Sequence, residues 1–151
     1  MLKSIERVLV PIDYSKPAFH AAWIAFSIAR SIKASITLIH IHIQENALRE
    51  LVFIDPHDLE ELTDEKFENL LQKIVGDPSY KALQSTVDHS VVEFDSCTYS
   101  PSVEICNYAK EKEINLIVMG SRIHSKLEEL MIGNVATEVL RKAPCPVTIV
   151  H

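Results

Sequence analysis

Apolar runs alternate along this chain with stretches of helical period. The apolar runs cover Arg7 to Asp13, Ser35 to Ile43, Val87 to Phe94, Ile114 to Gly120 and Pro146 to Val150. Short apolar runs of this length are typical of strands that are buried on both faces of a sheet. Each run except the last is followed by a stretch that predicts a helix. This alternation indicates β-α units built around a parallel sheet.

Four helices are expected. The first, Lys16 to Ile32, carries alanines at spacings of three and four, which allow close packing on a sheet, and Ser15 precedes it as an N-cap. The others are expected at about Asp58 to Val75, Ser100 to Glu111 and Asn134 to Lys142. Because β-α-β crossovers are right-handed, the helices should cover both faces of the sheet. The predicted fold is an open five-stranded parallel α/β sandwich of Rossmann-like type.

Composition narrows the class of protein. A chain of 151 residues with 47% hydrophobic content can bury a core, and we expect one domain spanning residues 1–151. No apolar run approaches the roughly 20 residues of a membrane span, and no apolar signal segment precedes the first strand, so a cytoplasmic protein is expected. The net charge of -6 disfavours binding to nucleic acid.

Local charge and cysteine content add two expectations. Between Asp58 and Glu68, six acidic side chains stand against one lysine, which predicts either the solvated face of a helix or an acidic docking surface. The three cysteines show no Cys-x-x-Cys spacing, so neither a disulfide framework nor a zinc site is indicated. Cys106 and Cys145 are expected to be buried free thiols, and Cys97 to lie in a loop.

Two glycines mark the candidate site. Gly120 ends the fourth apolar run, and Gly133 opens a helix thirteen residues later. Glycine lets the main chain turn and approach a ligand, and the free N-H groups at a helix start attract anions, so this pattern predicts a phosphate-binding site. In open parallel sheets, ligands bind at the carboxyl ends of strands, where Asp13 and Ile41 are also expected.

A wider motif surrounds these glycines. The universal stress protein family is marked by Gly, two residues, Gly, nine residues and then Gly-Ser or Gly-Thr, close to an Ala-Pro-Cys-Pro-Val strand. Gly120 fills the first position, Gly133 the third, and Ala143 to Val147 is intact. The opening strand, Val8 to Asp13, also looks like that of the family. The chain resembles this family over nearly all of its length.

The resemblance implies a stress-response protein that binds an adenine nucleotide, ATP or AMP, with Mg in the case of ATP. It implies that Asp13 contacts adenine, although Asp13 alternatively caps the first helix. Arg122 and His124 are expected either to neutralise phosphate or to lie in an exposed loop. The candidate binding residues are Pro11, Ile12, Asp13, Ile41, Met119, Gly120, Arg122, His124, Gly133, Asn134 and Val135.

Three departures from the family pattern concern the nucleotide. Ile123 stands where ATP-binding members have their second glycine, and a branched side chain resists positive φ. Asn134 replaces Ser or Thr, but still caps a helix. The segment Glu93 to Pro101 contains no glycine where the family usually has one. The alternative is therefore a family member with a decayed nucleotide pocket that acts as a dimeric interaction protein.

A homodimer is expected in either case. Pro146 to Val150 is an apolar strand at the sheet edge, whose main-chain groups need a partner, and the family resemblance implies pairing of these strands between two copies.

Enzymatic activity beyond slow, incidental ATP hydrolysis is not expected, because the sequence has no nucleophile elbow and no Walker loop. His40 and His42 alternate on one strand and could share a metal, but satisfied strand histidines are the expectation, so no metal site is predicted.

Overall fold

The computed structural model describes residues 3–12, 16–43, 86–96, 101–121 and 134–151, together with the single positions Pro78 and Ala82. Its elements in chain order are β1 (Arg7–Pro11), α1 (Lys16–Ile32), β2 (Ser35–Ile43), β3 (His89–Ser96), α6 (Pro101–Glu111), β4 (Leu116–Gly120), α7 (Asn134–Lys142) and β5 (Val147–Val150). The helix expected at Asp58 to Val75 lies outside these residues.

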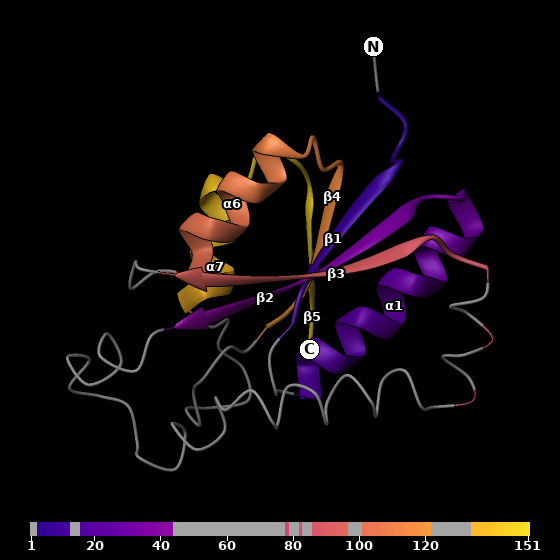
Figure 1. The fold of residues 1–151 in the computed structure, drawn as a ribbon, viewed down its shortest axis with the longest axis horizontal. Helices are drawn as coiled ribbons and strands as arrows, with labels where there is room; N and C mark the ends of the chain where they lie inside the picture. The colour runs from indigo at the N-terminus through magenta and orange to yellow at the C-terminus, as the bar shows by residue number, and fades with distance from the viewer. Residues whose placement is uncertain are drawn as a thin grey trace.

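The described strands form one five-stranded sheet in the order β3-β2-β1-β4-β5. Every neighbouring pair is parallel. The α/β class, the parallel sheet and its five strands are therefore confirmed. Figure 1 shows α1 on one side of the sheet and α6 with α7 on the other. From β1, the chain adds β2 and then β3 on one side of the sheet. It then returns to place β4 and β5 on the other side of β1. The strand order therefore reverses direction between β1 and β4.

The core has one layer on each face of the sheet. Alternate β1 residues point to opposite faces, since the strand period is two. Val8 and Val10 pack with α1 in a layer that includes the fully buried Phe26. Leu9 packs in the other layer with side chains of β4, α6 and α7. The alanines of α1 that face the sheet are buried at 0 to 2% exposure: Ala18, Ala21, Ala22, Ala25 and Ala29. Their small size lets this helix lie close to the strands.

Two helices end in the same type of cap, with a residue other than glycine in the left-handed conformation. Lys33 has φ 58° after α1, and Glu113 has φ 52° after α6. After α6, the N-H of Ile114 donates to the carbonyl of Ala109 at 2.9 Å, and that of Glu113 to Lys110 at 3.3 Å. This is the paired hydrogen-bond pattern of a Schellman motif.

The boundaries of four strands differ from the prediction. β1 ends at Pro11, so it does not extend to Asp13 as expected. β4 begins at Leu116 rather than Ile114, because the N-H of Ile114 is used to cap α6. β3 runs from His89 to Ser96 rather than from Val87 to Phe94. It extends past Phe94 because its pairing with β2 continues to Ser96. β5 begins at Val147, one residue later than expected, since Pro146 has no N-H to donate. Among the described helices, none is both long and apolar enough to cross a membrane.

Candidate functional site

The candidate site lies where the strand order reverses, at the carboxyl ends of β1 and β4. Pro11 ends β1 and Ile12 follows it, and both are buried; Met119 near the end of β4 is fully buried. Ile41, near the end of β2, is partly buried against the same core layer as Met119. The predicted members of the site that the structure describes are therefore brought to one edge of the sheet. Crevices outside this edge, at the reversal point, are where parallel sheets bind ligands.

A buried histidine fixes the end of β1. The His40 side chain is 4% exposed, and its Nδ1 lies 2.9 Å from the carbonyl oxygen of Ile12. Because a carbonyl only accepts, Nδ1 carries the proton in this bond. The N-H of Ile12 also donates to Ile39 of β2 at 2.9 Å. Both main-chain groups of Ile12 are thus held, immediately before Asp13. The expectation of a satisfied strand histidine is confirmed for His40.

Gly120 has a role that the sequence did not suggest. Its φ is not positive, so it does not form a left-handed turn. A Cβ at this position would lie 2.6 Å from the N of Ala18 and 2.7 Å from the carbonyl carbon of Pro17. The glycine is needed because the start of α1 approaches the end of β4 at main-chain distance. The expectation of a sharp glycine turn is wrong at Gly120, and close helix packing takes its place.

Ser121 is a polar residue of the site that sequence reasoning missed. It is 5% exposed and follows β4 directly, with its N-H donating to the carbonyl of Val150 at 2.7 Å. Within the described part of the chain, its hydroxyl makes no hydrogen bond. A buried hydroxyl normally has a partner, so this group is a candidate to meet a ligand. Its position directly after Gly120 was the available signal.

The start of α6 is tied to the middle of α7 on one face of the sheet. The hydroxyl of Ser102, which is fully buried, donates to the carboxylate of Glu138. α7 begins at Asn134, as predicted, and Val135 packs partly buried against the core. In a β-α-β unit the helix starts above the carboxyl edge of the sheet, so the N-terminus of α7 belongs to the candidate site.

Other predicted residues lie outside the described residues: Asp13, Arg122, His124 and Gly133, as well as Ile123 and Cys97. The side chain of His42 is also outside them, and the part of the chain that is described contains no group of three or more metal-binding side chains. The residues that are described fit an adenine nucleotide in one respect. They offer a buried hydroxyl and a helix N-terminus as hydrogen-bond donors at the same edge, which suits a phosphate group.

The two described cysteines are free and only partly buried, which corrects the expectation of full burial. Burial raises the pKa of Cys106, an effect that the charge of Lys142 opposes. Burial, and then the neighbouring Cys106, raises the pKa of Cys145. Both thiols therefore stay protonated at neutral pH and behave as small apolar side chains.

Comparisons with known proteins agree on a single family. Residues 4–151 match the model of the universal stress protein family. The universal stress protein YxiE of Bacillus subtilis is 33% identical over 151 residues, covering 97% of this chain and 99% of that protein. The structure of the universal stress protein UspA from Lactobacillus plantarum superposes with a TM-score of 0.74 at 23% identity, covering 99% of this chain and 100% of that one.

A third match is a ligand complex, the universal stress protein from Archaeoglobus fulgidus with dAMP. It superposes with a TM-score of 0.62 at 17% identity and covers 99% of this chain and 100% of that one. At such identities, the two solved structures show the fold alone. The family is shown by the match across almost the whole sequence and by the Bacillus relative. This chain belongs to the universal stress protein family.

Proposed function

We propose that this protein is a cytoplasmic stress-response module that binds an adenine nucleotide at the carboxyl ends of β1 and β4. The observation that carries the proposal is the hydroxyl of Ser121, which has no hydrogen-bond partner among the described residues and is buried at 5% exposure where the strand order reverses. The dAMP complex of the Archaeoglobus relative supports adenine as the base. Asp13 follows the fixed Ile12 and is the residue assigned to the base or the ribose.

The protein acts by binding rather than by turnover. Ser121 is the polar group assigned to the phosphate, and the N-terminus of α7 adds main-chain donors. These groups hold an anion, but they provide no activated nucleophile or general base. Nucleotide occupancy then alters contacts with a partner, and ATP is released unchanged or after slow hydrolysis.

The test is calorimetric titration of nucleotide-free protein with AMP and with Mg-ATP. We expect micromolar affinity for at least one nucleotide and a loss of about 10-fold or more in Asp13→Ala, since hydrogen bonds to a charged group contribute about 1.5–3 kcal/mol. Asp88→Ala is the matched control. It removes an exposed carboxylate that precedes β3, at the opposite edge of the sheet, and should leave affinity unchanged.

Absence of binding by the natural protein would contradict the proposal. If binding then appears in Ile123→Gly, the isoleucine closes the pocket and the protein is an interaction module with a decayed site. If Asp88→Ala weakens binding as much as Asp13→Ala does, the assignment of Asp13 is wrong.

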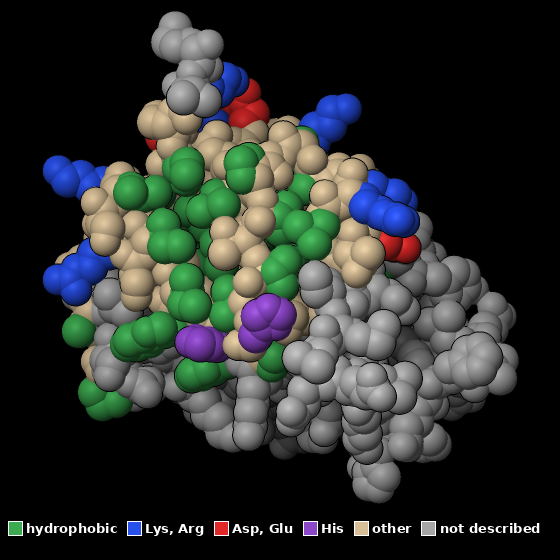
Figure 2. All heavy atoms as spheres, turned by 180° about the vertical axis from the view of Figure 1, so that it is seen from behind, with side chains coloured by type: hydrophobic (Ala, Val, Ile, Leu, Met, Phe, Trp, Pro, Cys, Tyr) green, Lys and Arg blue, Asp and Glu red, His purple; other side chains and the backbone are tan. Residues whose placement is uncertain are grey.

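We further propose a homodimer through the outer edge of β5. Among the described strands, β5 has a neighbour only on its β4 side. The carbonyls of Pro146 and Val150 face β4, so the main-chain groups of Val147 and Ile149 point away from it. Figure 2 shows hydrophobic side chains gathered on the face seen from behind, and Leu140 of α7 is 44% exposed. Burial of this face against a second copy would cover both the apolar side chains and the strand edge.

Sedimentation equilibrium tests the dimer. Ile149→Pro removes an outward N-H without removing a hydrogen bond to β4, and it should shift the protein to monomer. Thr148→Ala, which changes an exposed side chain on the same strand, should remain dimeric. A natural protein that sediments as a monomer at micromolar concentration would overturn this proposal.

A further inference from the structure

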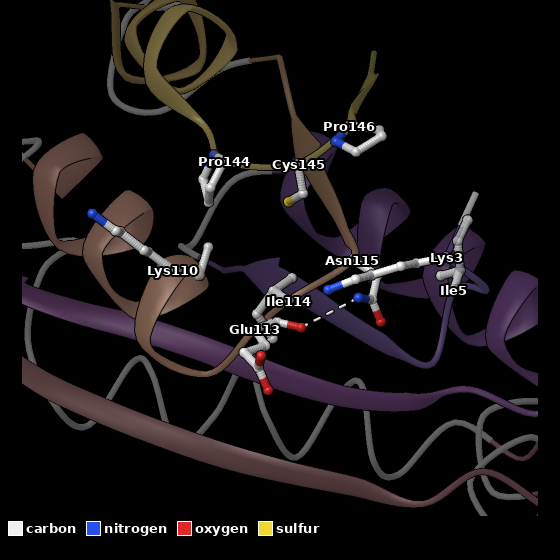
Figure 3. A pocket seen from close by; sticks show the side chains of 10 residues that line it. Lys3, Ile5, Lys110, Glu113, Ile114, Asn115, Pro144, Cys145 and Pro146 are labelled. Carbon is white, nitrogen blue, oxygen red and sulfur yellow. Dashed lines mark hydrogen bonds between the residues drawn. The ribbon is translucent and has the colours of Figure 1, made fainter. Parts of the chain in front are cut away.

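A hollow lies at the opposite edge of the sheet from the candidate nucleotide site. Its volume is about 520 Å³, and Figure 3 shows it from close by. Its lining comes from the segments that lead into β1, β4 and β5 and from the end of α6: Lys3, Ile5, Ala109, Lys110, Glu113, Ile114, Asn115, Pro144, Cys145 and Pro146. The amino ends of parallel strands meet here, so this hollow is separate from the site at their carboxyl ends.

The floor of the hollow is held by its own hydrogen bonds. Asn115 Oδ1 accepts from the N-H groups of Glu6 and Arg7, both at 2.9 Å. Its Nδ2 donates to the carbonyl of Glu113 at 3.3 Å, a bond visible in Figure 3. The N-H of Ile114 is also paired, because it donates to the carbonyl of Ala109 in the Schellman cap. Because these groups are already paired within the protein, the hollow is formed in advance, and its remaining polar lining is charged.

The free charge of the lining is positive. Glu113 is paired with Arg7 at 3.3 Å, so its carboxylate is compensated. Within the described residues, Lys3 and Lys110 form no ion pair. In Figure 3, the Lys3 side chain extends across the hollow, whereas the Lys110 side chain on α6 points away from it. An ammonium group donates hydrogen bonds and accepts none, so Lys3 favours an anion in the hollow.

The walls are apolar. Ile5 and Ile114 stand against Pro144 and Pro146, and the Cys145 thiol points into the space between them. Ile5 is 37% exposed, so part of its side chain is open to a ligand. Apolar walls with a few charged groups are typical of small-molecule sites, whose volumes run from about 300 to 1,000 Å³. A ligand for this hollow therefore combines one negative charge with an apolar body.

We propose that this hollow binds a small amphiphilic carboxylate, of the class of medium-chain aliphatic acids. The carboxylate accepts a hydrogen bond from Lys3, and the chain lies on Ile5, Ile114 and the two prolines. Such a ligand matches the positive rim and the apolar walls together, which neither an inorganic anion nor a neutral hydrocarbon does. Because the hollow is open to solvent, we expect weak binding, with Kd on the order of 0.1–1 mM.

The test is an NMR titration of the full chain with sodium octanoate, followed through backbone amide signals. We expect saturable shifts centred on Ile5, Ile114 and Cys145. Octan-1-ol, which has the same tail without the charge, and acetate, which has the charge without the tail, should each bind at least about 5-fold more weakly. Shifts that do not saturate, or that centre on the β5 face, would overturn the proposal.

Charge variants locate the anion. Lys3→Ala should weaken octanoate about 10-fold, and Lys3→Glu at least as much. Lys3 is exposed, so these changes leave the fold intact. Lys112→Ala is the matched control, since Lys112 is paired with Glu111 and does not line the hollow. Unchanged octanoate binding in Lys3→Ala would refute the site, as would equal weakening in Lys112→Ala.

Discussion

Gly120→Ala tests how the end of β4 is built. The added Cβ would lie 2.6 and 2.7 Å from main-chain atoms of α1 and 3.0 Å from the Cβ of Pro17. Contacting atoms normally lie about 3.5–4.0 Å apart, so the start of α1 must move by about 1 Å. Two of the three atoms belong to the main chain, so no side-chain rotation relieves the contact. The alanines that α1 packs on the sheet would move with it.

The expected loss of stability is about 3 kcal/mol, at the upper end of what an extra methylene costs in a packed core. For a domain of this size, that lowers Tm by about 6–12 °C. Urea unfolding measures it, with fluorescence of Trp23, the only tryptophan, reporting on α1. Ser121→Ala, at the next position, is the control and should stay within about 0.5 kcal/mol of the natural protein. A Gly120→Ala protein within that same margin would refute the close approach of α1.

Three further changes test the caps and the thiols. Lys33→Gly should stabilise the protein by about 0.5–1 kcal/mol in urea unfolding, because glycine accepts the φ of 58° without strain; a loss of stability would contradict this reasoning. Asn115→Ala should cost about 1–2 kcal/mol, since it releases two N-H groups that lead into β1, and Asn115→Asp, which keeps the accepting oxygen, should cost less. Burial raises the pKa of Cys145 above its ordinary value of 9.0, so this thiol ionises at lower pH in the unfolded chain than in the folded protein. The free energy of unfolding should therefore fall as pH rises past 9.0. Cys145→Ala should make this fall with pH less steep, and an unchanged pH dependence would count against burial of Cys145 as its cause.

Elements with strong local signals were predictable from the sequence. α1 and α7 have the predicted bounds, because small apolar residues recur at helical spacing and Asn134 marks a helix start. β2 also matches its predicted bounds of Ser35 to Ile43. In each case, the residues that define the element are close together in the chain. Periodicity is sufficient evidence for structure of this kind.

Features set by long-range contacts were not predictable. Nothing near Glu113 signals that it takes a left-handed conformation, because glycine is the usual residue at such a cap. The bond between His40 and Ile12 joins residues of neighbouring strands, and it depends on the register of β1 with β2. The hollow at the amino edge is assembled from three separate segments of the chain. These arrangements follow from strand order, which the sequence pattern left open.

The packing role of Gly120 changes how the family motif should be used as a guide to function. A glycine is required there for α1 to approach β4, whether or not the protein binds a nucleotide. Its presence therefore gives equal support to a working pocket and to a decayed one. The two functions are distinguished at other positions: Asp13, which follows Ile12 in the chain and is assigned to the base or the ribose, and Ile123, which stands in place of the second glycine. Titrations of Asp13→Ala and Ile123→Gly thus decide between the two functions, whereas loss of binding in Gly120→Ala would follow from the displaced helix in either case.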